Sequence, residues 1–211
     1  RKLAERYCDA PNVVMADLFN EPFSARWGNG DRGKDWHMAA QRLGDHLLEL
    51  CPRWLIFVQG VGSNSGHAAS SCSDYGCYWG ENVQGHLTHP VALTDPTKLV
   101  LSPHVYGPSV HNQPYFTDKG FPDNMPDIWN LQWGHVPLTS DFPIVIGEWG
   151  GRFEGADKVW QEKMAAFLAD PKHRIAGSFY WSLNPESEDT GGLITDWGSM
   201  NPEQVKLDIL S

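Results

Sequence analysis

Short, almost continuous apolar runs alternate along the chain with longer segments in which apolar residues recur every three or four positions. The runs cover residues 13–19, 54–59, 98–105, 143–147 and 176–181. Apolar runs of this length are typical of strands buried on both faces of a parallel sheet. Their starts are spaced about 30 to 45 residues apart, which predicts repeated strand-helix units of an α/β fold.

Two helices between these runs are predicted by a one-sided apolar stripe. The first follows Asp35 and ends before Pro52, and its stripe consists of Trp36, Ala40, Leu43, Leu47 and Leu50. The second begins near Asp157, with a stripe of Trp160, Met164 and Phe167. These segments therefore predict helices that pack one face against the sheet.

Helices are also predicted near both ends of the chain. Residues 1–7, "RKLAERY", predict the end of one helix, and Asn201 predicts the cap of another, with Pro202 and Glu203 in its first turn. The five strand-helix units fit an open doubly wound sheet or a (β/α)8 barrel. Five such units are too few to close a barrel, and we expect residues 1–211 to form a single domain.

Charge and hydropathy exclude two classes of partner. The chain has 16 basic and 26 acidic side chains, a formal net charge of -10. Nucleic acids and anionic membranes are bound through basic surfaces, so we expect neither as a partner. The chain also contains no run of about 18 apolar residues, the length that a membrane-spanning helix needs.

Four cysteines allow three disulfide pairings. Cys72 and Cys77 lie in a loop rich in Ser, Gly and Asp, and their spacing suits a local disulfide; zinc is a weaker alternative because only two thiols are near and no Cys-x-x-Cys pair occurs. Cys8 and Cys51 each precede a predicted strand, so they could meet at one end of the fold. Disulfides favour a secreted protein.

Residues with a candidate chemical role stand at four of the five predicted strands, at the end where chemistry gathers in α/β folds. They are Asn20 and Glu21 after the first run, His104 and Tyr106 at the third, Glu148 at the fourth and Trp181 at the fifth. The second run ends in Gln59 and Gly60, to which we assign no chemistry. Each of these residues alone is more often structural, but their agreement at one end favours a catalytic site.

Two carboxylates on separate strands, with aromatic residues between them, suit cleavage of a glycosidic bond. One carboxylic acid donates a proton to the leaving oxygen, and the other carboxylate attacks the anomeric carbon or activates water. Aromatic rings bind the apolar faces of sugars. Trp27, Trp79 and Trp133 lie on polar, glycine-bearing loops, where a role in the core is less expected.

Four motifs together resemble glycoside hydrolase family 5, the retaining cellulases on a (β/α)8 barrel. They are Asn20-Glu21-Pro22, His104-x-Tyr106, Ile146-Gly147-Glu148 and the Trp181-Ser-x-Asn-Pro stretch, with "NMPDIWN" and "DTGG" as further matching segments. The resemblance extends over nearly the whole chain and is greatest to bacterial endo-β-1,4-glucanases. It implies a β-1,4-linked polysaccharide substrate and no cofactor or metal.

The resemblance assigns a role to each matching residue. It implies that Glu21 is the general acid/base, Glu148 the nucleophile, and Asn20 a hydrogen-bond partner of the sugar 2-hydroxyl. It implies that Tyr106 holds Glu148 by a hydrogen bond and that His104 lines the same subsite. Before the attack Glu148 is negative, and its charge favours a proton on Glu21. Once Glu148 is esterified that charge is gone, so Glu21 can ionise and serve as base.

The same resemblance implies a sugar platform at Trp181. Trp79 is a second candidate platform, because its loop follows the second run. A retaining mechanism further predicts carboxyl groups roughly 5 to 5.5 Å apart.

The chain departs from the family pattern at its beginning. The first three strands of the family's barrel, with an arginine and a further histidine of the active site, are not found. We therefore expect strands four to eight only, in a partial sequence or in a chain whose missing strands come from a separate chain. Residues 1–211 alone should not form a stable, active monomer, because two strand edges stay open.

Three alternatives remain. A mannanase or another β-glycanase would share both glutamates. A non-catalytic carbohydrate-binding remnant would keep the tryptophans without turnover. An open-sheet nucleotide-binding protein would need a glycine-rich turn after the first strand, where this chain has "NEPFSARWGNGDRGKD" in place of G-x-G-x-x-G.

Overall fold

The structure is a computed structural model that describes residues 1–22, 24–62, 72 and 76–211. The described residues form one six-stranded sheet in which every pair of neighbouring strands is parallel. Its strands are β1 (Met15–Asp17), β2 (Leu55–Val58), β3 (Leu99–Leu101), β4 (His104–Tyr106), β5 (Ile144–Gly150) and β6 (Ile175–Tyr180). The parallel sheet confirms the α/β class predicted from the apolar runs.

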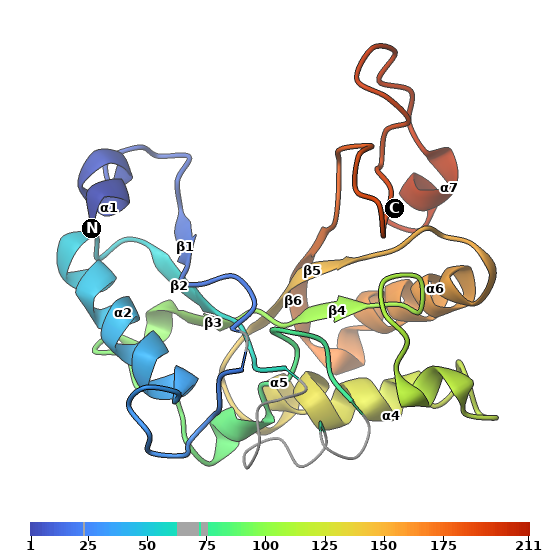
Figure 1. Ribbon diagram of the computed structural model, residues 1–211. Helices are drawn as coiled ribbons and strands as arrows, with labels where there is room; N and C mark the ends of the chain where they lie inside the picture. The colour runs from blue at the N-terminus through green and yellow to red at the C-terminus, as the bar shows by residue number, and fades with distance from the viewer. Residues whose placement is uncertain (23, 63–71, 73–75) are drawn as a thin grey trace.

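With β3 and β4 counted as two successive pieces of one strand, the strands follow the order of the chain around a curved wall (Figure 1). The strand β1 pairs with β2, which pairs with β3, and both β3 and β4 pair with β5, which in turn pairs with β6. Parallel strands in chain order that curl in one direction form part of a (β/α)8 barrel. Figure 1 shows β1 and β6 at the two edges of this half-barrel, below two raised arms that contain the chain ends.

The single strand expected over residues 98–105 is divided into β3 and β4, so that prediction was wrong in its extent. Leu101 pairs with Ile144, and the register resumes at His104 opposite Glu148. Pro103 lies between the two strands and has no N–H to donate to a ladder. Its carbonyl still accepts a hydrogen bond from the Gly147 N–H at 2.8 Å, which keeps both pieces against β5.

Helices cover the outer face of the sheet (Figure 1). They are α2 (Trp36–Leu50), α4 (Met125–Trp129), α5 (Val136–Thr139) and α6 (Gly155–Ala169), with a π-helical turn at Asn130–Gly134. The helix α1 (Lys2–Tyr7) packs on α2, and α7 (Gln204–Asp208) lies in the raised arm near the C-terminus. Short 3₁₀ helices occur at Gln84–Leu87, Pro96–Lys98, Pro114–Thr117 and Pro171–His173. The two amphipathic helices predicted after Asp35 and near Asp157 are α2 and α6.

The terminal helix begins later than predicted. Its cap is Glu203 rather than Asn201, and its first residue is Gln204. Pro202 instead forms a bridge with Ile194, and the Glu203 N–H donates to the Leu193 carbonyl at 2.8 Å. These contacts keep the segment before the helix extended.

The core lies between the sheet and the helices. Trp129 packs edge-to-face against Trp160 and Phe167, with ring centroids 5.9 and 5.1 Å away. Trp27 and Trp133 are also fully buried, so the expectation that they are not core residues was wrong for these two. Burying such large rings is among the strongest stabilising contributions available to a domain of this size.

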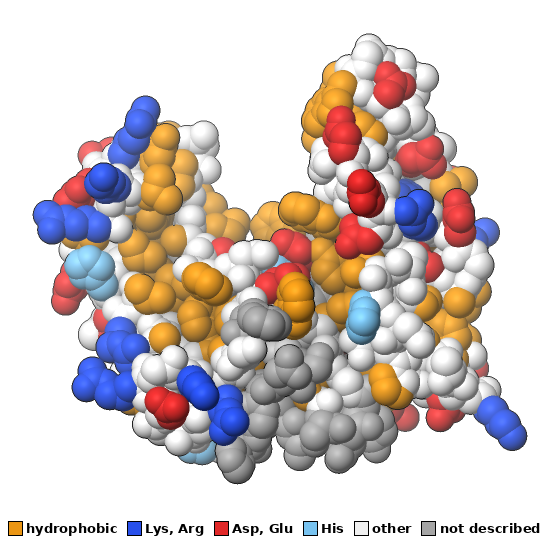
Figure 2. Space-filling model, viewed as in Figure 1, with side chains coloured by type: hydrophobic (Ala, Val, Ile, Leu, Met, Phe, Trp, Pro, Cys, Tyr) orange, Lys and Arg blue, Asp and Glu red, His pale blue; other side chains and the backbone are white. Residues whose placement is uncertain are grey.

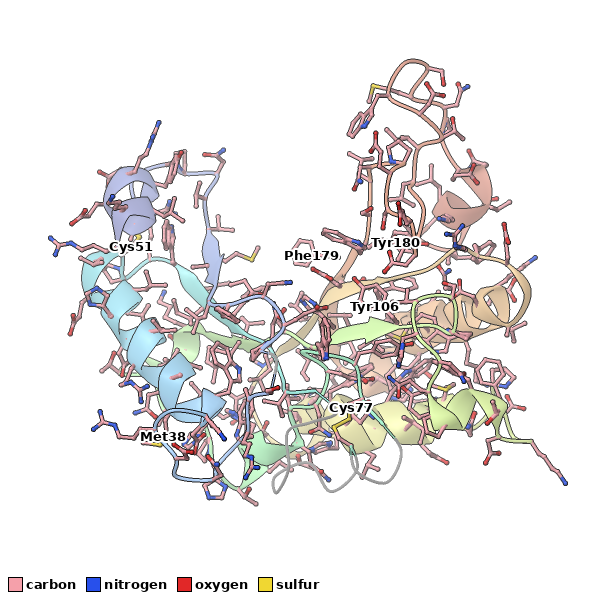
Figure 3. The ribbon with its side chains drawn as sticks, in the orientation of Figure 1. Met38, Cys51, Cys77, Tyr106, Phe179 and Tyr180 are labelled. Carbon is pink, nitrogen blue, oxygen red and sulfur yellow. A yellow bond between two sulfur atoms is a disulfide. The ribbon has the colours of Figure 1, made fainter. Side chains whose placement is uncertain are left out.

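The concave face of the half-barrel is open at β6. Phe179 is 48% exposed, whereas the next residue, Tyr180, packs on Trp149 with ring centroids 5.2 Å apart. Figure 3 shows the two side chains on opposite sides of the strand, with Phe179 toward the hollow. Successive residues of a strand point to opposite faces, so the concave face here keeps an apolar side chain in solvent.

Both cysteine pairs form disulfides. Cys8 joins Cys51, which connects the end of α1 to the end of α2, and Cys72 joins Cys77. Within the described part of the chain, every helix is too short or too polar to cross a membrane.

Candidate active site

A cavity of about 430 Å³ opens at the carboxyl ends of the strands. It is lined by Asn20, Glu21, Cys77, Tyr78, Trp79, Tyr106, Val110, His111, Gln113, Glu148, Trp181 and Asp189. Figure 2 shows acidic side chains at the bottom of the hollow between the two arms, with hydrophobic side chains around them. The polar residues predicted at the ends of the first, third and fourth strands therefore gather at one place with Trp181.

Glu21 and Glu148 approach each other across His104. The Nδ1 atom of His104 is 3.0 Å from Oε1 of Glu21 and 3.2 Å from Oε2 of Glu148. One oxygen of each carboxylate lies within 4.8 Å of the other. Both glutamates remain partly open to solvent, with side-chain exposures of 22% and 19%. A substrate in the cavity can therefore reach both carboxylates.

The charge of His104 is set by these two neighbours. Burial by itself would lower the pKa of His104, but the hydrogen bonds and negative charges of Glu148 and Glu21 outweigh it and raise the pKa to about 9. While both glutamates are ionised, the ring therefore favours its protonated form and shares its Nδ1–H between the carboxylates. The sequence predicted His104 only as a residue lining the subsite.

Tyr106 ends β4 beside Glu148 on the neighbouring strand. Its hydroxyl donates to Oε2 of Glu148 at 2.5 Å. Burial first, and then the negative charge of Glu148, raise the pKa of Tyr106 above its ordinary value, so the phenol keeps its proton. The register places His104, not Tyr106, directly opposite Glu148, and Figure 3 shows Tyr106 at the base of the hollow.

The remaining predicted residues lie around this centre. Asn20 lines the main cavity and also a second, adjoining cavity of about 260 Å³ with Gln59, His104 and Glu148. Trp79 and Trp181 both line the main cavity and are 50% and 44% exposed. Half-exposed aromatic rings beside a cavity are typical of a ligand-binding site.

Comparison with known proteins agrees with this geometry. Residues 1–187 match the family "Cellulase (glycosyl hydrolase family 5)". The chain belongs to this family. An endoglucanase of Paenibacillus polymyxa is 41% identical over 98% of this chain, and the major extracellular endoglucanase of Xanthomonas campestris pv. campestris is 39% identical over 98%.

The fold of this chain also matches that of a solved structure. A variant of the endocellulase from Pyrococcus horikoshii in complex with cellotetraose superposes with a TM-score of 0.90, at 40% identity and over 99% of this chain. The chain spans about half the length of the curated relatives, 52% and 42% of the two endoglucanases, and 59% of the crystallised chain. In these relatives the matched part belongs to one longer chain, so the comparisons do not support a separate chain that supplies further strands.

Several residues of this family 5 site were missed in the sequence. Gln59, at the end of β2, received no role, although its Oε1 accepts the Glu21 N–H at 2.6 Å. Tyr78, His111 and Asp189 also line the cavity. Asp189 lies in the "DTGG" segment that matched the family motifs, and His111 follows the third strand, so both had a sequence signal. Gln59 could have been found by applying the strand-end rule to all five runs.

The carboxylate-histidine cluster is also the group, among the described residues, whose spacing could hold a metal ion. Glu21, His104 and Glu148 place three ligand atoms within 4.8 Å of one another. A metal would need the unprotonated Nδ1 of His104, whereas the two carboxylates favour its protonated form. The donor set therefore fits a shared proton better than a metal ion.

Proposed function

We propose that the protein is a retaining endo-β-1,4-glucanase, with Glu21 as general acid/base and Glu148 as nucleophile. The observation that carries this proposal is the short separation of the two carboxylates, with one oxygen of each within 4.8 Å of the other. Retaining glycosidases hold their carboxyl groups about 5 to 5.5 Å apart, whereas inverting enzymes leave roughly 6.5 to 9.5 Å for a water molecule.

In the first step, an oxygen lone pair of Glu148 forms a bond to the anomeric carbon. The bond from that carbon to the glycosidic oxygen breaks, and the electron pair stays on the oxygen. Glu21 gives its proton to this oxygen, so the leaving sugar departs as an alcohol. Tyr106 and His104 hold Glu148 in place through the contacts at 2.5 and 3.2 Å.

In the second step, the oxygen of a water molecule attacks the anomeric carbon and passes a proton to Glu21. The bond between that carbon and Glu148 breaks, and its electron pair returns to the carboxylate. Two inversions restore the original configuration, and the proton is back on Glu21. His104 contacts both glutamates, so it keeps them aligned in both steps.

The cavity suits a polysaccharide of β-1,4-linked glucose. Trp79 and Trp181 offer half-exposed rings on which pyranose rings can stack, and Asn20 lies beside both glutamates where a sugar hydroxyl would sit. The similar proteins are named endoglucanases, and one is described with cellotetraose. These observations favour cellulose or a related β-glucan over mannan or xylan.

The protein is proposed to act outside the cell as one catalytic domain. Two disulfides suit an oxidising compartment. One relative is named a major extracellular endoglucanase. Residues 1–211 share a single sheet, so they contribute to one domain rather than two.

Hydrolysis of cellotetraose followed by proton NMR tests the reaction. The β-anomer is expected to form first, before mutarotation, and initial appearance of the α-anomer would falsify the retaining mechanism. Parallel rates on carboxymethylcellulose, mannan and xylan test the substrate, with the glucan hydrolysed fastest. Glu21→Gln in the full-length protein separates an enzyme from a pure binding protein, because only an enzyme loses turnover while it keeps its affinity.

A further inference from the structure

A buried glutamine lies beneath the two catalytic glutamates. Gln59 is only 1% exposed at the end of β2. Its Oε1 accepts the main-chain N–H of Glu21 at 2.6 Å, and its Nε2 donates to Oδ2 of Asp17 at 3.0 Å. An N–H can only donate and a carboxylate can only accept, so these partners fix which way the amide faces. Gln59 thus connects Asp17, the last residue of β1, to Glu21 in the loop after that strand.

The peptide that Gln59 holds has an unusual conformation. Glu21 has a φ of 48°, in the left-handed region that a residue with a Cβ atom rarely adopts. Such a conformation persists only where neighbouring contacts hold it. The hydrogen bond from the Glu21 N–H to Gln59 is a contact of this kind, and it aims the Glu21 carboxylate at His104, 3.0 Å away.

Gln59 itself has little room to move. Its main-chain carbonyl accepts a hydrogen bond from Nε1 of Trp36 at 2.8 Å. On its other side, a Cβ atom added to Gly80 would lie 2.9 Å from the Gln59 Oε1 and 3.6 Å from Cγ of Glu21. The amide is therefore enclosed between two strand ends, a helix and the Gly80 backbone, and this rigidity is transmitted to Glu21.

We propose that Gln59 is a positioning residue for the general acid/base, one that sets where the Glu21 carboxyl meets the glycosidic oxygen. The inference rests on the proposed function and deepens it. Gln59 makes no contact with Glu148 among its described hydrogen bonds. Its loss should therefore weaken the two proton transfers at Glu21 and leave sugar binding and the nucleophile in place.

Substrates with different leaving groups separate these effects. The sugar alkoxide of cellotetraose needs a proton to depart, whereas 2,4-dinitrophenolate departs without one, so only the first substrate needs Glu21 in the first step. Azide attacks the glycosyl-enzyme without a general base, because it has no proton to lose. A change that impairs only Glu21 should therefore slow the first step little with the dinitrophenyl substrate. In the second step, azide should restore the rate that the impaired Glu21 lowers.

The first variant is Gln59→Leu in the full-length protein. We expect kcat for cellotetraose to fall about 100-fold with little change in KM, because a misplacement near 1 Å costs about that much. The burst of dinitrophenolate from 2,4-dinitrophenyl β-cellobioside should keep its rate. Azide should restore steady-state turnover of this substrate and yield the β-glycosyl azide.

Gln161→Leu is the matched control. Gln161 is also fully buried, donates to an aspartate, Asp157, at 2.6 Å, and accepts from the Tyr180 hydroxyl at 2.7 Å. It makes no described contact with Glu21. This variant should lose stability like Gln59→Leu. The ratio of its kcat values for the two substrates should equal that of the wild type, and azide should not change its turnover.

Gln59→Glu tests the same idea if Gln59→Leu fails to fold. It keeps an acceptor for the Glu21 N–H but places a second carboxyl group against Asp17. The two carboxylates repel each other unless they share a proton. Its activity relative to wild type should rise as pH falls. Asp17, Glu21, His104 and Glu148 face the same region, so the ratio to wild type at each pH removes their own titration.

The outcomes separate the inference from the proposed function. Equal losses on both substrates, no azide response, or a Gln59→Glu profile parallel to wild type would overturn the role of Gln59 while wild-type hydrolysis remains intact. A wild-type protein that hydrolyses neither substrate would overturn the proposed function, and the role of Gln59 with it.

Discussion

At the scale of single residues, the site depends on hydrogen bonds that hold Glu148, the proposed nucleophile. Tyr106 donates to Glu148 at 2.5 Å, and a hydrogen bond to a charged group contributes about 1.5 to 3 kcal/mol. We therefore expect Tyr106→Phe to lower kcat about 10- to 100-fold, with a smaller change in KM, measured on cellotetraose.

Tyr180→Phe is the control for Tyr106→Phe. The Tyr180 hydroxyl also makes a side-chain hydrogen bond, to Gln161 at 2.7 Å, and Tyr180 is not part of the cavity lining. It should cost some stability and keep kcat near that of the wild type. An equal loss of kcat in both variants would show that the hydroxyl of Tyr106 acts through stability alone.

The charge of His104 predicts a pH dependence. Its pKa in the folded protein is raised to about 9 from an ordinary value near 6.5, so the folded state binds the proton more tightly than the unfolded state. The stabilisation is complete below about pH 6.5 and is lost as pH rises through about 9. Thermal unfolding midpoints of the wild type should therefore fall across this window, and His104→Gln should remove that part of the decline.

His86→Gln is the control for the pH experiment. Burial, and then the charge of His37, lower the pKa of His86 to about 4, so His86 is neutral throughout the window. This variant should be less stable but should keep the wild-type slope. If His104→Gln also keeps that slope, His104 is not the group that titrates there.

The residue-level chemistry could be predicted from the sequence only in part. The proximity of Glu21 and Glu148 could be predicted because both follow apolar runs whose carboxyl ends meet in a parallel sheet. The bond between Gln59 and Glu21 depends on the register of β1 and β2, in which Asp17 lies opposite Phe57. No local pattern encodes that register, so the contact required the structure.

At the scale of elements, the apolar runs located each strand that the structure describes, but not every boundary. The run over 98–105 contains Pro103, and a continuous strand could have been doubted because proline breaks a ladder. The start of α7 was misplaced for a different reason. Asn201 and Pro202 have the residue types of a helix cap and first turn, but tertiary hydrogen bonds to residues 193–195 hold them outside the helix.

The two disulfides should affect stability and activity differently. Cys8 and Cys51 are separated by 43 residues and lie far from the cavity lining, and Arg53 adds hydrogen bonds to the carbonyls of Cys8, Ala10 and Val13. Replacing this pair by serine should lower the free energy of unfolding by about 2 to 4 kcal/mol, with kcat unchanged below the transition. Denaturant unfolding and activity at 25 °C check this.

The second pair, Cys72 and Cys77, is the comparison for the first. Its separation is only five residues, so it removes less entropy from the unfolded chain, but Cys77 lines the cavity next to Tyr78 and Trp79. Its replacement should raise KM for cellotetraose more than it lowers stability. The opposite ranking of the two pairs would contradict the assignment of the first to stability and the second to the site.

At the scale of the whole molecule, the open edges of the half-barrel predict the behaviour of residues 1–211 as an isolated polypeptide. Phe19, Phe179 and Leu183 are 57%, 48% and 55% exposed near β1 and β6, and each exposed side chain of this kind forgoes about 1.5 to 3 kcal/mol of burial. An unpaired strand edge also offers its N–H and C=O groups to other chains. We expect this polypeptide to self-associate, as measured by light scattering, and to hydrolyse carboxymethylcellulose far more slowly than the full-length protein.

A double variant of the same polypeptide separates self-association from catalysis. Phe179→Lys with Leu183→Lys places charges on the β6 side and should reduce association, because charged residues block edge-to-edge pairing. It should not restore activity, since the carboxylates would still lack the remaining barrel wall that would enclose a sugar beside Glu21 and Glu148. A monomeric polypeptide with full activity would show that the described half-barrel is sufficient for catalysis, and would make the open edges a tolerated feature of the fold.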